Sequence, residues 1–336
     1  TFFGLYQLGG WGEMMAILDR AAEGGNSPAA SEFFNLWRPM SDTEYPWTGM
    51  LFGAPILGVW YWRTDQYIVQ RALSAKDIPN ARKGALFAGY LKLLPVFIFF
   101  IPGVIAFALM QEGMLEFSME KADQALPAMI TNFLPSGLKG LAIAGLLAAL
   151  MSSLSSAFNS SSTLLTIDFY QQKNPNATEK DLVRFGQIAT VVLVIVSLGW
   201  IPFMETLMGG GIFLYIQSVQ AYISPPIAAV FLFGLFYPWI NARGAIVALW
   251  SGFAVGIFRL VIEFMSKEGA ITLSEGSFLS MFLGINFLHF ALFLFIFCAA
   301  VLMLVSKTSE AQNPEDLAML TFQRNGDKAG FSLNTD

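Results

Sequence analysis

The stretch from Leu141 to Tyr170 restricts what this chain can fold into more than any other. It carries no charge until Asp168, and its first half, Leu141 to Met151, consists only of Ala, Leu, Ile, Gly and Met. An uncharged segment of about 20 residues or more is long enough to cross the apolar part of a bilayer as a helix. We therefore predict a membrane helix here, and its second half is crowded with Ser and Thr.

The hydroxyl side chains in the middle of this helix have two interpretations. Small hydroxyl residues let membrane helices pack closely, and they can bond back to carbonyls of their own helix. Alternatively, several hydroxyls on one face, with a free carbonyl, can replace the water shell of a small hard cation. Ala149, Ser152, Ser153 and Ser156 are spaced i, i+3, i+4 and i+7, so they share one face. The spacing alone leaves both interpretations open.

The composition predicts a polytopic membrane protein. Of 336 residues, 55% are hydrophobic and only 13% are charged, against about 25% charged in soluble domains. A single histidine, His289, excludes the usual kind of zinc site, and a single cysteine, Cys298, excludes an intrachain disulfide. The polar residues expected at membrane depth include no base–nucleophile pair. We therefore do not expect this protein to be an enzyme. We also expect no nucleic-acid partner and no obligate protein partner.

Apolar segments predict an all-α fold with seven complete spans, at about residues 48–69, 84–110, 141–170, 185–207, 211–237, 242–264 and 280–305. Pro55 and Gly58 are predicted to interrupt the first span in its middle. Shorter helices are expected near residues 13–22 and 123–133. Because the chain starts inside an apolar run, we interpret residues 1–6 as the end of a truncated helix in a longer protein.

Basic residues in the loops predict the orientation. Cytoplasmic loops of membrane proteins carry an excess of Lys and Arg. The loops after the first and third spans are basic, and the tail falls on the same side by alternation, so we expect the tail, residues 306–336, to be cytoplasmic. The basic residues of those two loops are Arg71, Lys76, Arg82, Lys83, Lys173, Lys180 and Arg184.

Polar and aromatic residues within the spans are candidates for a binding site. Lys92 either reaches a partner or water at membrane depth or extends its long stem to the surface. Gln217 either binds a ligand or holds two helices together. Trp60, Tyr61 and Trp62 either form an interfacial belt or, directly after the predicted break, a platform under a sugar ring. The residues alone do not decide between these alternatives.

Four segments together resemble the sodium/solute symporter family, in particular its sodium/glucose cotransporter branch. They are VWYWRTDQYIVQRALSAK, GYLKLLP, GLLAALMSSLSSAFNSSSTLLTIDFY and YIQSVQAYISPPIAAVFL, in this order. The resemblance implies the LeuT-type inverted-repeat fold. On that template residues 1–47 are the remnant of a helix and an extracellular loop, and residues 48–237 are the second five-helix repeat. Residues 238–305 then form two additional helices before the tail.

The resemblance also implies site residues. A sodium ion would be held by the carbonyl of Ala149 and the hydroxyls of Ser152 and Ser153. Ser155 and Ser156 match the positions of a second sodium site in members that couple two ions.

For the sugar, the resemblance implies that Tyr61 stacks on the ring and closes the inner side, and the adjacent Trp62 belongs to the same aromatic platform. Lys92 and Gln217 match residues that bind sugar hydroxyls. The chain departs from the family at Gly58, where relatives place Thr or Asn, and at Arg63, where relatives have a small residue.

We therefore expect an integral, multi-pass protein of the cell membrane that imports a hexose or similar polyol with sodium by alternating access. Sodium, a sugar and the lipid bilayer are its expected partners. The alternatives are the same machinery with another cargo, such as sialic acid, myo-inositol or a carboxylate, and a transporter-like sugar sensor.

Overall fold

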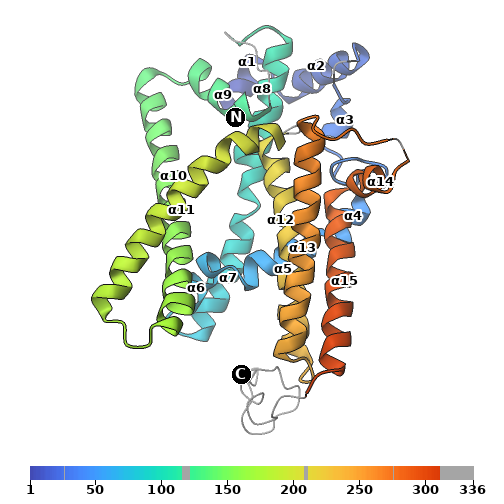
Figure 1. The fold of residues 1–336 in the computed structure, drawn as a ribbon. Helices are drawn as coiled ribbons and strands as arrows, with labels where there is room; N and C mark the ends of the chain where they lie inside the picture. Colours follow the sequence, from blue (N-terminus) through green and yellow to red (C-terminus); the bar gives the residue numbers. More distant parts are fainter. Residues whose placement is uncertain (26, 116–121, 208–210, 275, 311–336) are drawn as a thin grey trace. The chain divides into compact units, whose positions relative to one another are not determined.

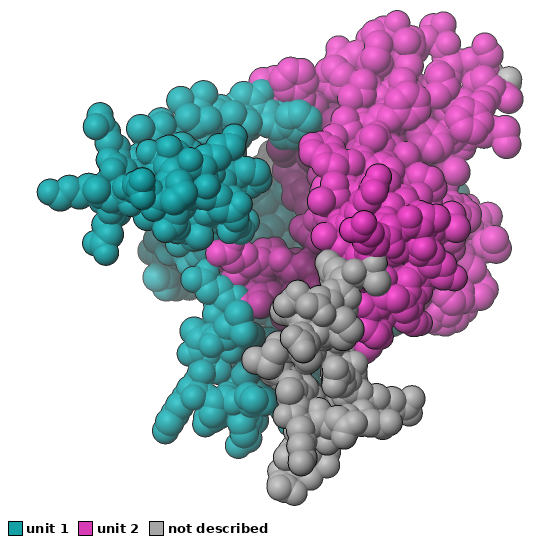
Figure 2. All heavy atoms as spheres, turned by 60° about the horizontal axis from the view of Figure 1, so that its bottom comes forward, with its two compact units in different colours: residues 1–36, 70–201 teal, residues 37–69, 202–336 magenta. Residues whose placement is uncertain are grey.

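The computed structural model describes residues 1–25, 27–115, 122–207, 211–274 and 276–310, and every regular element in these residues is a helix (Figure 1). The predicted all-α architecture is therefore confirmed. Most of the predicted tail, from residue 311 onward, lies outside the described residues. The chain divides into two compact units, residues 1–36 with 70–201 and residues 37–69 with 202–336 (Figure 2). We call them unit 1 and unit 2 and describe each by itself.

Unit 1 contains short helices and three long helical segments. Its elements are α1 (Phe2–Gln7), α2 (Trp11–Glu23), α3 (Ala30–Phe33), α7 (Ile78–Leu91), η1 (Val96–Phe100), α8 (Ile101–Gln111), η2 (Ala122–Gln124), α9 (Ala125–Phe133), α10 (Ser136–Leu164) and η3 (Leu165–Gln171). Most of α11 (Glu179–Leu207) also belongs to it, and α6 (Gln66–Leu73) crosses the boundary between the units. The helices predicted near residues 13–22 and 123–133 correspond to α2 and α9.

The core of unit 1 forms where α8 packs against α1, α2 and α9. Met14 and Leu18 of α2 and Ile105 and Leu109 of α8 are fully buried there. Gly4 of α1 has no Cβ, which lets α1 approach Ile105 closely. This core is apolar throughout and contains none of the predicted site residues.

Unit 2 is a helical bundle built on α12 (Ile212–Phe236), α13 (Ala242–Lys267) and α15 (Phe287–Lys307), which pack on one another (Figure 1). Its shorter helices are α4 (Trp47–Phe52), α5 (Ala54–Arg63) and α14 (Phe278–Gly284). Small residues make the close contacts, as is common between membrane helices. A Cβ on Gly252 would lie 2.5 Å from Cys298 Sγ and 2.7 Å from Pro226 Cβ. Cys298 is a buried free thiol.

Six helical segments in the described residues are long and apolar enough to cross a membrane. They correspond to six of the seven predicted spans, which confirms a multi-pass membrane protein. The first predicted span, residues 48–69, is not continuous, because α4, α5 and α6 replace it. The predicted span at 280–305 begins later than expected, since α14 ends at Gly284 and Asn286 caps a new helix, α15.

The break in the first span is also not where the sequence placed it. Gly58 lies inside α5, and Pro55 occupies the first turn of that helix, where proline is tolerated. The helix is interrupted at Gly53, between α4 and α5, and again at Thr64 and Asp65. The prediction of a broken helix was right, but its assignment to Gly58 was wrong.

Candidate functional site

The break between α4 and α5 lies against the start of α15. A Cβ on Gly53 would be 2.1 Å from the carbonyl oxygen of Leu288 and 2.7 Å from its carbonyl carbon, so only glycine fits without a backbone shift. One turn before the break, Thr48 Oγ1 and His289 Nε2 are hydrogen-bonded at 2.7 Å. Asn286 Nδ2 donates to the carbonyl of Thr43 at 2.8 Å. These contacts hold α4 on α15.

The second interruption is a helix end followed by a helix start. Thr64 Oγ1 donates to the carbonyl of Trp60 at 2.8 Å, and the N–H of Asp65 donates to the same carbonyl at 3.2 Å. Asp65 Oδ1 accepts a hydrogen bond from the N–H of Tyr67 at 3.0 Å, in the manner of an N-terminal cap. Asp65 therefore starts α6. Its neighbour Arg63 is exposed at the end of α5.

The aromatic triplet forms the last turn of α5. The rings of Trp60 and Tyr61 are tilted with centroids 6.5 Å apart, and those of Tyr61 and Trp62 meet edge to face at 5.4 Å. Tyr61 is half-buried, whereas Trp62 is 39% exposed. Adjacent aromatic rings that are not fully buried are what a stacking platform for a sugar needs.

Gln217 lies on α12, which packs against α5. It precedes Ala221 by one turn, and Tyr61 follows Leu57 by one turn; Leu57 and Ala221 belong to the same buried cluster. Tyr61 and Gln217 are both half-buried, and their helices pack against each other in unit 2. These two predicted substrate residues belong to the same unit and to neighbouring helices.

The serine face lies on α10 in unit 1, within an unbroken helix. Ala149, Ser152, Ser153 and Ser155 are exposed in the described chain, and Ser156 is half-buried. Hydroxyl and carbonyl oxygens are the ligands that a small hard cation takes, so the donor set of Ala149, Ser152 and Ser153 fits sodium chemically.

Ser156 has other contacts on the same helix face. Its hydroxyl donates to the carbonyl of Ser152 at 3.0 Å, which is the back-bonding expected of serine in a membrane helix. The guanidinium of Arg71 reaches the same hydroxyl in a long contact of 3.5 Å. Ser156 thus makes the back-bond of the packing interpretation, and its part in an ion site stays a prediction.

Lys92 follows the last residue of α7, at a point where the long helical segment Ile78–Gln111 is distorted. Its backbone N–H donates to the carbonyls of Ala88 and Gly89, and the chain then passes Pro95 into the wider turns of η1. The side chain is exposed in the described chain. Lys92 belongs to unit 1, and Tyr61 and Gln217 belong to unit 2, so a shared sugar site remains a prediction.

Two charged residues of α13 were not among the predicted site residues. Arg259 is only 3% exposed, and its guanidinium lies 4.2 Å from the ring centroid of Phe290. Glu263, one turn further, accepts a hydrogen bond from the hydroxyl of Tyr222 on α12. The sequence carried one signal that could have found them. Charged residues recur at four-residue intervals, which places them on one helix face: Arg259, Glu263 and Lys267.

Comparison with known proteins identifies the family. The model of the sodium:solute symporter family matches residues 1–252. The chain belongs to the sodium:solute symporter family. The predicted resemblance is thereby confirmed, and because symporters are transporters, so is the expectation that the chain is not an enzyme.

Individual relatives of this chain are cotransporters. The chain is 35% identical over 328 residues to sodium/glucose cotransporter 1 of Ovis aries, covering 91% of this chain and 49% of the relative. It is 39% identical over 282 residues to the sodium/mannose cotransporter of Bos taurus, covering 81% and 47%. It is 42% identical over 243 residues to sodium/myo-inositol cotransporter 2 of Homo sapiens, covering 69% and 36%. The chain thus spans about half the length of the first two of these relatives.

Proposed function

We propose that the full-length protein is a sodium-coupled symporter that imports a hexose or a similar polyol through the cell membrane. The observation that carries this proposal is the placement of Tyr61 and Gln217 on α5 and α12, two helices that pack together, in a chain of the symporter family. The named cargoes of the relatives, glucose, mannose and myo-inositol, are all neutral polyhydroxylated rings. They support a class of cargo and favour no single sugar.

In the proposed site the ring of Tyr61 stacks on one face of the sugar, and Trp62 extends the platform. Gln217 forms hydrogen bonds with the hydroxyls at the edge of the sugar. Lys92 keeps the sugar-binding role that the resemblance implies for it. A buried polar group that loses its ligand costs about 1–3 kcal/mol, so such contacts reject ligands that lack the matching hydroxyls. This polar rim would select for polyols over apolar molecules of similar size.

We assign the coupling sodium ion to the serine face of α10. The carbonyl of Ala149 and the hydroxyls of Ser152 and Ser153 would supply three oxygen ligands, and Ser155 with Ser156 are the candidates for a second ion. If sodium and sugar both favour the same conformational state, each raises the affinity for the other by the same factor. Transport then follows when that state closes and opens to the other side.

The test is uptake by the full-length protein in proteoliposomes, with a panel of labelled sugars and an imposed inward sodium gradient. We expect at least one hexose or polyol to accumulate against its gradient, and the accumulation to vanish when potassium replaces sodium. Uptake that does not depend on sodium would refute the coupling. Saturable sugar binding without any flux would favour the sensor alternative instead.

A further inference from the structure

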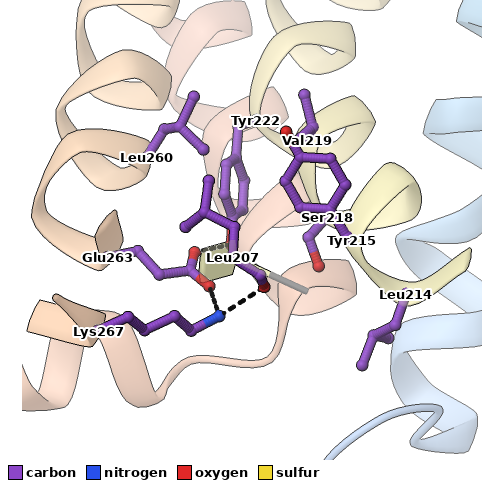
Figure 3. Close-up of a pocket in the computed structure, with 9 residues that line it drawn as sticks. All are labelled: Leu207, Leu214, Tyr215, Ser218, Val219, Tyr222, Leu260, Glu263 and Lys267. Atoms are coloured by element: carbon purple, nitrogen blue, oxygen red, sulfur yellow. Dashed lines mark hydrogen bonds and ion pairs between the residues drawn. The ribbon is translucent and has the colours of Figure 1, made fainter. Parts of the chain in front are cut away.

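The contact between α12 and α13 is close along one part of the two helices and open along another. A Cβ on Gly256 of α13 would lie 2.1 Å from the carbonyl oxygen of Tyr222, so the two backbones touch there. Beyond this contact, toward the start of α12, a cavity of about 80 Å³ lies between the helices (Figure 3). Tyr215, Ser218, Val219 and Tyr222 line it from α12. Side chains around such a cavity lack apolar partners on one side, so packing alone restrains this part of α12 weakly.

A series of polar contacts, the polar chain, connects side chains at the edge of the cavity (Figure 3). The hydroxyl of Tyr222 donates to Glu263 Oε2 at 2.9 Å. The ammonium of Lys267 donates to Glu263 Oε1 at 2.9 Å and to the carbonyl of Leu207, at the end of α11, also at 2.9 Å. The Tyr222 side chain is thus tied through Glu263 to the ends of two other helices.

The ring of Tyr222 is fixed on its other sides as well. It meets the ring of Phe290 edge to face, with centroids 5.3 Å apart and an interplanar angle of 85°. The guanidinium of Arg259 lies 5.0 Å from the Tyr222 ring centroid. Since the ring cannot turn freely, a change at its hydroxyl is transmitted to the α12 backbone.

Gln217 lies on the other side of α12. The four residues that line the cavity are spaced i, i+3, i+4 and i+7 and share one face. At 3.6 residues per turn, Gln217 is about 150° around the helix from the centre of that face. A rotation of α12 by only about 10° would move a side-chain end about 6 Å from the helix axis by about 1 Å. A shift of that size is enough to break a hydrogen bond to a ligand.

We propose that Tyr222 and Glu263 are positioning residues for Gln217: their hydrogen bond sets the rotation of α12, and Lys267 holds Glu263 in place. This inference rests on the proposed function, in which Gln217 binds the sugar. Neither Tyr222 nor Glu263 touches the sugar in this arrangement.

The test is a mutant cycle in the full-length protein, read out as half-saturation by sugar and by sodium. Tyr222→Phe keeps the ring and removes the hydroxyl, so we expect sugar half-saturation to rise roughly three- to tenfold, which is a fraction of the strength of one hydrogen bond to a charged group. Sodium half-saturation should stay within about twofold. The matched control is Ser218→Ala, which lines the same cavity but stands outside the polar chain, and it should leave both values unchanged.

The decisive arm repeats Tyr222→Phe in a Gln217→Ala background. If Tyr222 acts through Gln217, the second substitution should change sugar half-saturation by less than about twofold, because coupled residues are not additive. Additive effects would show that Tyr222 serves general stability, and the proposal would be wrong. If Tyr222→Phe lowers expression, Glu263→Gln replaces it, since it weakens the same contact and keeps the side-chain shape.

A second measurement does not depend on the cargo. Gln217→Cys is combined with Cys298→Ala, any cysteine elsewhere in the full-length chain is also replaced, and the single introduced thiol is labelled with a thiol reagent in membranes. We expect Tyr222→Phe, but not Ser218→Ala, to change the labelling rate at least threefold. Equal rates would overturn the positioning role even where sugar transport is observed. A changed rate without sodium-driven sugar uptake would refute the proposed function and leave the positioning of residue 217 supported.

Discussion

The contact of Gly53 with α15 can be tested with two alanine substitutions in one short segment. In Gly53→Ala the new Cβ would lie 2.1 Å from the Leu288 carbonyl oxygen, whereas in Gly58→Ala nothing lies within 4 Å of it. The atom in the way at Gly53 belongs to the backbone, so no rotamer change relieves the clash. Either α4 or α15 must move by about 1 Å, and overpacking of this kind costs about 1–3 kcal/mol.

The comparison of the two variants isolates that cost. Gly53 has φ −87° and ψ −48°, which alanine adopts without strain. Both substitutions therefore gain about 0.4–1 kcal/mol from the reduced entropy of the unfolded chain. Because this gain is common to both, the difference between them measures the clash. We expect Gly58→Ala to be neutral or slightly stabilising. Gly53→Ala should be less stable than Gly58→Ala by about 1–3 kcal/mol.

The assay is thermal or denaturant unfolding of the purified full-length protein in detergent, with both variants measured beside the parent. Gly53→Ser should behave like Gly53→Ala, since it adds the same Cβ. Stabilities of Gly53→Ala and Gly58→Ala within about 0.5 kcal/mol of each other, the scatter typical of harmless substitutions, would refute the close approach of α4 to α15.

The remaining predictions concern the proposed sites. Ser153→Ala removes one oxygen ligand and keeps a good helix former, so sodium half-saturation in uptake assays should rise with little change in stability; an unchanged value would contradict the ion assignment. Tyr61→Phe should keep transport with modest weakening, whereas Tyr61→Ala should weaken sugar affinity by roughly 0.5–1.5 kcal/mol beyond burial and allow sodium flux without sugar, measured in the same vesicles. Lys92→Ala and Gln217→Glu should reduce sugar affinity more than sodium affinity, and equal effects on both would assign these residues to the fold.

The helices of this chain could be predicted from its sequence because their signals are local. The uncharged run that begins at Leu141 lies within α10 and the start of η3, and the short helix expected near residues 123–133 corresponds to α9. The helix break was misplaced because the role of Gly53 depends on Leu288, which is far away in the sequence. Gly58 carries the same local signal as Gly53 but has no such partner, so composition could not distinguish them.

The candidate site shows the same limit. Tyr61 and Gln217 were selected from the sequence, and the structure assigns both to the packed pair of α5 and α12. The hydrogen bond between Tyr222 and Glu263 escaped prediction because it joins two helices and requires their relative rotation.

The attachment of α4 to α15 has a consequence for how this protein can be divided. Thr48 and Gly53 contact His289 and Leu288, so the first helix of the segment 48–237 depends on a helix that follows it in the sequence. A fragment that ends at residue 237 would expose that face of α4 and leave its hydrogen-bonding groups to solvent or lipid. Expression of residues 48–237 by themselves should therefore fail unless α15 is supplied as a separate chain, and complementation by the two fragments would then restore the fold.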